Sequence, residues 1–300
     1  FLLDDFANLD ALGKFGGVRN WETFKLYLLG NTSGPSGRFL SLLSFLINDN
    51  NWPSDPFSFK YTNLLLHLLT GVLLAWLIYR LMLSLAPERR EQRAALVALL
   101  TAALWLLHPF QVSTTLYIVQ RMAILSALFS IMGLLIYVHG RSLLASQPRQ
   151  AYCWMTLSVI LCAPLAFFSK ENGALLPLLI LVMEYTALRH SNSQQPASRW
   201  VFIFLGLPTI LLFGYFLIHW NGVLEGYKTR PFTLTERLLT ESRIVSQYLN
   251  HLLIPNLGNS GIFNENPALS HGLLDPPTTL IAVLFIIISI LGAWWARVRY

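Results

Sequence analysis

The stretch YTNLLLHLLTGVLLAWLIYRLML, residues 61–83, decides the fold class. It is apolar almost throughout, and only Arg80 carries a fixed charge within it. A helix that crosses a bilayer needs about 20 consecutive, mostly apolar residues. The stretch therefore predicts a membrane-spanning helix.

The composition of the whole chain agrees with this prediction. The protein has 300 residues, of which 54% are hydrophobic and 12% are charged, whereas about 25% of residues are charged in a soluble domain. Its mean hydropathy is +0.52. Cys153 and Cys162 lie in one apolar run and are predicted to be buried membrane thiols. The net charge of +6 is spread over loops, which disfavours nucleic-acid binding.

Six further apolar stretches are able to span a membrane, so the sequence predicts an all-α, polytopic membrane protein. They lie at about 94–110, 121–139, 151–168, 173–188, 200–219 and 278–296. The stretch 173–188 is short and needs its flanks. The chain does not begin with Met, so we expect an upstream segment, and a helix there would bring the number of spans to eight.

The distribution of arginine predicts the orientation. Arginines concentrate in alternate connections between the spans, and cytoplasmic loops carry an excess of Lys and Arg. These arginines are 80, 89, 90, 93, 141, 149, 189, 199, 297 and 299. Only Arg121 and Lys170 occupy the short loops of the opposite side. The arginine-rich side is therefore predicted to be cytoplasmic.

This orientation places the two long loops outside and divides the chain into four parts. Residues 1–60 form the first outer loop, 61–219 the helical core, 220–277 the second outer loop and 278–300 the last span. Each outer loop contains a segment expected to lie in the membrane interface: 37–48 in the first and 233–252 in the second.

The second of these segments carries the stronger helix signal. Thr233 followed by Glu236 is typical of a capping box at a helix N-terminus. An apolar stripe follows at helical spacing, and polar residues lie off it. The stripe comprises Leu234, Leu238, Val245, Leu249 and Leu252, and the polar residues are Arg237, Glu241, Arg243 and Gln247.

The acid pair Asp4-Asp5 follows an apolar stub at the outer edge of the core. The pair is interpreted either as a solvated helix end or N-cap, or as a general base at the membrane surface. Adjacent residues of a helix do not share a face. One carboxylate could then act on a substrate while the other orients it or binds.

Arg121 and Lys170 are the cations of the short outer loops, and two interpretations remain open for them. They could hold an anionic head group at the depth of the lipid phosphates. Alternatively, their side chains snorkel to the interface, with Lys170 pairing locally with Glu171.

Polar residues within the spans have a structural interpretation. His67 lies one helical turn after Asn63, and such residues commonly hydrogen-bond between membrane helices. His108-Pro109 is expected to end a span. The histidines and cysteines show no metal-ligand spacing, so no metal is predicted. The absence of a P-loop, GxGxxG or GxSxG motif disfavours nucleotide and serine hydrolysis.

Several motifs together resemble the GT-C class of membrane glycosyltransferases. They are most similar to the transmembrane and tetratricopeptide-repeat-containing O-mannosyltransferases and their bacterial relatives. The motifs, in chain order, are FLLDDF, SGRFLSLLSFLI, FKYTNLLLHLLTGVLLAWL, HPFQVSTTLYIVQRMAILSALF, FSKENGALLPLLILVMEY and FTLTERLLTESRIVSQYLNHLLIP.

The resemblance implies a GT-C-like helical core with two long outer loops, and a sugar donor linked to polyprenyl phosphate. It implies a catalytic carboxylate at Asp4 or Asp5, with Asp4 favoured. It assigns donor-phosphate binding to Arg121, Lys170, Arg237 and Arg243. It assigns the donor or acceptor pocket to Arg38, Asn63, His67, His108, Glu171 and Asn172.

The reaction implied is an inverting transfer of a sugar to a hydroxyl of a protein Ser/Thr or a glycan, without a cofactor. Its setting would be a bacterial inner membrane with a periplasmic active face, or the equivalent endoplasmic reticulum membrane. The alternatives are a transporter or flippase of a polyprenyl-linked glycan, and a non-catalytic membrane scaffold. A transporter should show mid-span ionisable residues or broken helices in matched halves, and the sequence shows neither.

Overall fold

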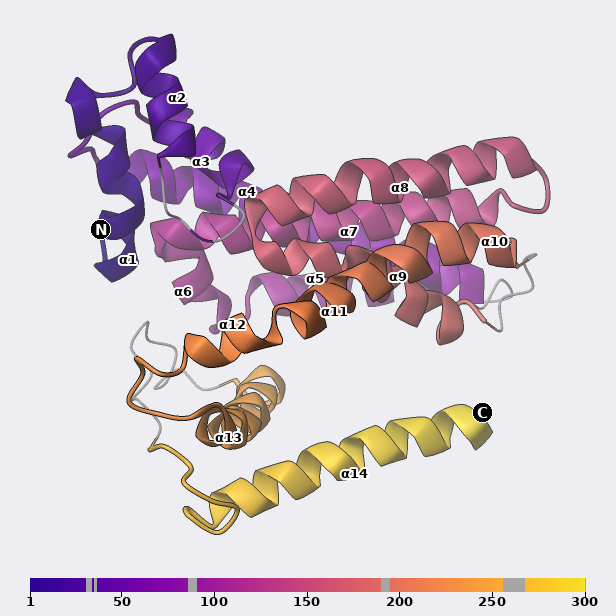
Figure 1. Cartoon of the computed structure of the whole chain (residues 1–300). Helices are drawn as coiled ribbons and strands as arrows, with labels where there is room; N and C mark the ends of the chain where they lie inside the picture. The colour runs from indigo at the N-terminus through magenta and orange to yellow at the C-terminus, as the bar shows by residue number, and fades with distance from the viewer. Residues whose placement is uncertain (31–33, 35–36, 86–90, 190–194, 256–267, 300) are drawn as a thin grey trace. The chain divides into compact units, whose positions relative to one another are not determined.

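The computed structural model of the chain describes residues 1–30, 34, 37–85, 91–189, 195–255 and 268–299. The regular elements in these ranges are all helices, and no strand occurs there (Figure 1). The all-α prediction is confirmed for this part of the chain. Arg89 and Arg90, which the orientation argument uses, lie outside the described residues.

The chain divides into two compact units, which are described separately below. The first comprises Phe1–Leu107 and Gln111–Leu211, and the second His108–Phe110 and Leu212–Tyr300. The boundary falls inside helix α11, Leu207–Ile218.

In the described residues, five helical stretches are long and apolar enough to cross a membrane. They are Pro56–Ser84, Ile118–Ser142, Pro148–Ser169, Ser198–Ile218 and Thr278–Ala296. Each coincides with one of the seven predicted spans. The predicted spans 94–110 and 173–188 form shorter helices.

The first of these two is α5, Glu91–Leu106, with 16 described residues. It ends just before His108-Pro109, as expected, because a residue that precedes proline is driven away from helical geometry. The second prediction covers the 3₁₀ turn Glu171–Leu175 (η4) and the 10-residue helix α9, Leu176–Tyr185. Pro177 in the first turn of α9 suits a helix start, where no N–H bond is lost.

Short helices precede the first long one. They are α1 (Leu3–Leu9), the 3₁₀ turns η1 (Asp10–Leu12) and η2 (Lys14–Gly16), α2 (Trp21–Leu29) and α3 (Phe39–Leu46). Helix α3 lies inside the expected segment 37–48. Helix α4, Pro56–Leu85, begins before the predicted residue 61. Its early start leaves a shorter N-terminal region than the predicted first loop.

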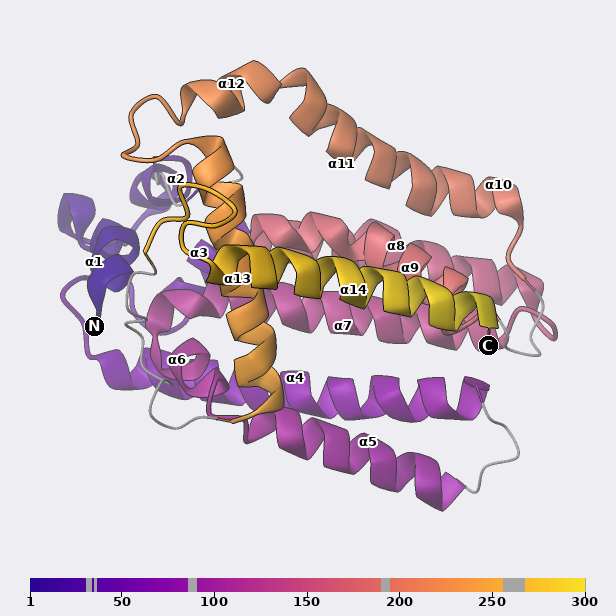
Figure 2. The same cartoon turned by 90° about the horizontal axis from the view of Figure 1, so that it is seen from below.

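The long helices of the first unit pack side by side (Figures 1 and 2). Helix α7, Arg121–Ser142, contacts α4 and α8, Pro148–Ser169, while α5 packs on α4. Two short elements, α6 (Gln111–Leu116) and η3 (Ile118–Gln120), lead into α7. The prediction of buried thiols is confirmed for Cys162 and wrong for Cys153, which is exposed on the surface of α8.

The core of this bundle lies between α7, α8 and α9. Its fully buried members include Tyr137, Met155, Cys162, Leu176 and Ile180. Large apolar side chains cover the outward faces of the long helices, with exposed fractions of 54% for Trp76 and 64% for Leu99. An exposed apolar surface of this extent is what contact with lipid requires.

One helix contains a wide turn. Helix α10 (Ser198–Val201), the π-helical turn η5 (Phe202–Gly206) and α11 follow one another without a break. The N–H of Leu207 donates to the carbonyl of Phe202, five residues earlier. Pro208 follows directly. In a regular α-helix its ring would clash with the carbonyl four residues before it, and a π turn relieves such a clash.

Gly173 in η4 packs directly on the backbone of α8, because a Cβ there would lie 2.1 Å from the carbonyl carbon of Ala166. We expect Gly173→Ala to force α8 and η4 apart and to destabilise the fold by about 1–3 kcal/mol, as overpacking does elsewhere. A thermal melt of the purified protein measures this. Gly214→Ala is the matched control, since its Cβ would meet nothing within 4 Å. An equal melting temperature for both variants would contradict the close approach.

The second unit contains α12 (Trp220–Glu225), α13 (Leu234–Leu253) and α14 (Thr278–Arg299). The predicted capping box is confirmed. The N–H of Glu236 donates to Thr233 Oγ1 at 3.2 Å, and the N–H of Thr233 donates to Glu236 Oε2 at 2.8 Å. Helix α13 packs across the beginning of α14 (Figure 2).

Candidate functional site

Many of the predicted site residues gather at one end of the first unit, formed by α1, α3, η3, η4 and the last turn of α8. We call it the Asp4 end. Asp5 is buried there, with 1% of its surface exposed. Its carboxylate accepts hydrogen bonds from the N–H of Val119 at 2.8 Å and from that of Leu2 at 2.9 Å. Asp5 therefore fastens α1 to the segment that leads into α7.

Burial raises the pKa of Asp5, and the two backbone donors oppose this rise by stabilising the ionised carboxylate. A buried carboxylate whose oxygens face backbone N–H groups is poorly placed to take a proton from an incoming substrate. The geometry thus gives Asp5 an anchoring role.

Asp4 is placed differently, since its side chain is exposed. Its backbone N–H donates to the hydroxyl of Tyr117 at 2.9 Å. The same hydroxyl also interacts with the Asp4 carboxylate. Burial raises the pKa of Tyr117, and the negative charge of Asp4 adds to the rise. Asp4 is therefore the accessible carboxylate of the pair, and its backbone is held by a neutral phenol.

Arg121, predicted to bind the donor phosphate, is completely buried. Its guanidinium donates to Asn63 Oδ1 at 2.7 Å, to the Ser44 carbonyl at 2.9 Å and to the Phe59 carbonyl at 2.8 Å. The ring of Phe45 lies 4.9 Å from its Cζ, a cation–π distance. These contacts join α3, α4 and α7, so Arg121 has a structural position in the first unit.

Asn63, assigned to the pocket, belongs to the hydrogen-bond network around Arg121. Besides accepting from Arg121, it lies with Nδ2 3.4 Å from the carbonyl of Tyr117 and 3.3 Å from that of Ile118. Both are residues beside or within η3. Asn63 and Arg121 together hold the segment to which Asp5 fastens α1.

Arg38 and Glu171, both assigned to the pocket, form an ion pair. Arg38 Nε lies 3.1 Å from both carboxylate oxygens of Glu171, and Nη2 lies 3.0 Å from Oε2. Arg38 Nη1 also lies 3.3 Å from the sulfur of Met122, beside Arg121. Glu171 thus pairs with an arginine more than a hundred residues away, and the local pairing with Lys170 considered above is not observed.

Lys170 makes no ion pair with any described residue. It is half-buried beside the pair of Arg38 and Glu171. Burial lowers its pKa, the charge of Arg38 adds to the lowering, and the charge of Glu171 opposes it. Of the two predicted cations of the short loops, Arg121 is fully buried and Lys170 remains partly exposed.

The remaining pocket residues make local contacts. His67 Nε2 lies 3.3 Å from the carbonyl of Leu106, so His67 bridges α4 and α5, as polar residues between membrane helices do. Asn172 Oδ1 accepts from the hydroxyl of Ser126 at 3.1 Å. His108 belongs to the second unit, where its Nδ1 accepts from the N–H of Phe110 at 3.2 Å.

Arg237 and Arg243, also predicted to bind phosphate, lie on α13 in the second unit. Arg237 Nη2 is 3.4 Å from Glu241 Oε1, one helical turn away. Arg243 Nη1 donates to the Ala268 carbonyl at 2.8 Å.

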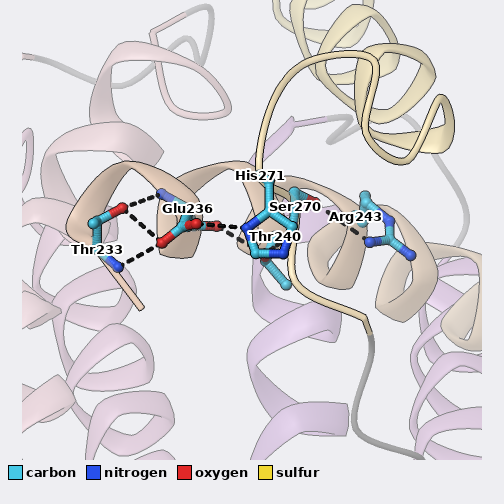
Figure 3. Close-up of polar contacts among 6 residues, drawn as sticks. All are labelled: Thr233, Glu236, Thr240, Arg243, Ser270 and His271. Carbon is cyan, nitrogen blue, oxygen red and sulfur yellow. Dashed lines mark hydrogen bonds and ion pairs between the residues drawn. The ribbon is translucent and has the colours of Figure 1, made fainter. Parts of the chain in front are cut away.

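A second polar cluster on α13 was not predicted (Figure 3). Glu236 Oε1 lies 2.6 Å from His271 Nδ1, while its other oxygen accepts from Thr233. Next to this pair, the N–H of Ser270 donates to Thr240 Oγ1 at 2.9 Å. The segment that precedes α14 is thereby attached to α13. No sequence signal for this long-range pairing was recognised.

The pair responds to pH in a defined direction. The backbone N–H of Thr233, with help from His271, lowers the pKa of Glu236 to about 2. The hydrogen bond to Glu236, with a smaller contribution from the charge of Asp275, raises the pKa of His271. Because the pKa of His271 is raised, its stabilising contribution is complete below pH of about 6.5. It is lost as the pH rises through the folded pKa.

We expect Glu236→Gln to lower the pKa of His271 back toward its ordinary value of about 6.5. The measurement is an NMR titration of the imidazole in the full-length protein. Asp275→Asn is the control and should lower this pKa less, because Asp275 contributes only through its charge. An unchanged His271 pKa in Glu236→Gln would show that the contact does not exist in solution.

A buried ionic cluster lies away from the Asp4 end, in the last turn of α7. Arg141 Nε is 2.6 Å from Glu184 Oε1, and the Tyr137 hydroxyl donates to the same oxygen at 2.7 Å. The assignment of Arg141 to a cytoplasmic loop was wrong, since the residue is helical and only 2% exposed. The sequence does contain a signal for this pair, because Glu184 lies within an apolar run and a carboxylate there requires a partner.

The described residues contain no group of three or more His, Cys, Asp or Glu side chains able to hold a metal ion. The Asp4 end contains an exposed carboxylate, Asp4, beside the phenol of Tyr117, and the half-buried amine of Lys170 lies beside Arg38 and Glu171. A carboxylate can accept a proton, and an amine can stabilise an anion. No protein-family model, curated protein or solved structure matches the chain.

Proposed function

We propose that the chain is an inverting glycosyltransferase of the GT-C class. It would move a sugar from a polyprenyl phosphate to a hydroxyl of a protein or a glycan, on the outer side of the membrane that the chain spans. The observation that carries the proposal is the unequal placement of the acid pair. Asp4 is exposed, while Asp5 is buried and fastens the helix that bears both.

In the proposed reaction, Asp4 takes the proton of the acceptor hydroxyl as its oxygen attacks the anomeric carbon. The bond from that carbon to the phosphate oxygen breaks, and the lipid phosphate leaves with the electron pair. Attack opposite the leaving group inverts the configuration of the sugar. One carboxylate is enough, because a phosphate leaves as an anion and does not need an acid.

Lys170 is the cation of the first unit best suited to stabilise the leaving phosphate. It carries no ion pair with a described residue, whereas Arg38 is paired with Glu171 and Arg121 donates to three neutral oxygens. Preorganised charge at the position where charge develops is the most effective form of stabilisation.

The test is sugar transfer by purified full-length protein in detergent, with a panel of polyprenyl-phosphate sugars and a hydroxyl acceptor. Transfer from at least one donor, with inverted product, would support the proposal. Absence of transfer from every donor would overturn it. Movement of a polyprenyl-linked glycan across liposomes that contain the protein would then support the flippase alternative.

A further inference from the structure

A groove of about 530 Å³ lies between α13 and α14, within the second unit. This volume is in the range of small-molecule sites. One part of its lining is polar and the other apolar. The polar residues are Arg243, Ser246, Gln247, Asn250 and Thr278, and the apolar residues are Leu249, Leu253, Ile281, Ala282 and Phe285.

Arg243 is held in position at the polar part. Its Nη1 donates to the Ala268 carbonyl at 2.8 Å and lies 3.3 Å from Ser270 Oγ. Ser270 is buried and is itself fixed by Thr240 and Thr279. Figure 3 shows the guanidinium of Arg243 approaching Ser270 through one of its nitrogens. Arg243 makes no ion pair with a described residue, so its positive charge is uncompensated there.

The groove begins where a membrane span begins. The stretch Thr278–Ala296 is long and apolar enough to cross a membrane, and Thr278 lines the groove at its first residue. The apolar lining is open, with 77% of Leu253 and 66% of Ile281 exposed. The groove thus joins a fixed cation to an open apolar surface at the start of a stretch able to cross a membrane.

From this arrangement we propose that the groove binds an anionic glycerophospholipid of the surrounding bilayer. Its phosphate would lie at Arg243, and an acyl chain would lie along Leu253, Ile281 and Phe285. A single arginine matches the single negative charge of a phosphodiester. The hydroxyls and amides of Ser246, Gln247 and Asn250 match the neutral oxygens of glycerol and its esters.

This site is separate from the proposed transfer chemistry, because it needs no sugar donor. It gives Arg243 a bilayer lipid as its ligand, where the sequence predicted the phosphate of the donor. The two sources of lipid phosphate can be separated experimentally.

The experiment is native mass spectrometry of the full-length protein, equilibrated with phosphatidylglycerol, phosphatidylcholine or undecaprenyl phosphate. We expect wild type to retain phosphatidylglycerol about fivefold better than phosphatidylcholine, since one arginine near a membrane surface contributes about that factor. Arg243→Gln should abolish the preference. Arg237→Gln is the matched control on the same helix, because Arg237 pairs with Glu241 and does not line the groove.

Gln247→Glu provides a second test at an exposed position where folding is not at risk. Its negative charge should weaken retention of phosphatidylglycerol and leave phosphatidylcholine unchanged. The proposal is overturned if Arg243→Gln and Arg237→Gln retain phosphatidylglycerol equally, or if both phospholipids bind equally to wild type. It is also overturned if undecaprenyl phosphate displaces phosphatidylglycerol at equal concentration. Arg243 would then bind the polyprenyl phosphate of the sugar donor.

Discussion

Replacing Asp4 by Asn is expected to lower sugar transfer about 10²- to 10⁴-fold, the usual contribution of a positioned general base. The melting temperature should not change. The Asp4 side chain is exposed, and the substitution preserves the hydrogen bond from the backbone N–H to Tyr117. The amide oxygen of Asn can still accept from the Tyr117 hydroxyl, which interacts with the Asp4 carboxylate. The measurement combines a transfer assay with a thermal melt of the same preparation.

Asp5→Asn is the matched control and should give the opposite pattern. An amide presents only one acceptor oxygen to the N–H groups of Val119 and Leu2, so one buried donor would lose its partner. We expect a loss of stability of about 1–3 kcal/mol. Transfer should fall only as far as the folded fraction falls. If Asp5→Asn abolished transfer at an unchanged melting temperature, the assignment of the base to Asp4 would be wrong.

Arg121→Met is expected to destabilise the first unit by at least about 3 kcal/mol. The substitution leaves Asn63 Oδ1 and the carbonyls of Ser44 and Phe59 without their donor. A hydrogen bond from a charged donor contributes about 1.5–3 kcal/mol, and the substitution removes all three. The readout is the melting temperature, together with the yield of monodisperse protein.

Two further variants complete this test. Arg121→Lys should recover only part of the stability, because an ammonium cannot reproduce the planar fork that reaches three acceptors. Arg237→Met, which removes a half-exposed pair with Glu241, should cost no more than about 0.5 kcal/mol. If Arg121→Met melted normally but failed to transfer sugar, Arg121 would be a phosphate ligand, as the resemblance implies.

The helices were largely predictable from sequence because they depend on local patterns. Five apolar runs became five long helices, and the Thr233–Glu236 capping box marks the start of α13. The prediction of one continuous span at 173–188 was wrong. Apolarity does not distinguish the 3₁₀ turn of η4 from a helix, and the close contact of Gly173 with α8 is a tertiary feature.

The site was predictable as a set of residue types but not as an arrangement. Sequence identified Asp4, Asp5, Arg38, Arg121 and Glu171 as unusual polar groups. Their partners lie far along the chain, and hydropathy carries no information about such distances. Hydropathy therefore could not place Asp5 and Arg121 in the interior, and could not identify Tyr117 as the residue that holds Asp4.

The π-helical turn at Phe202–Gly206 also determines how α11 is rotated about its own axis, and therefore which of its side chains face outward. A π turn accommodates one residue more than a regular turn, and one residue corresponds to a rotation of about 100° around the axis of an α-helix. Trp200 and Leu205 are buried, whereas α11 has no buried residue. The azimuth of the whole following segment therefore depends on a single inserted residue. A chain one residue shorter at this point would present a different stripe of side chains to the lipid.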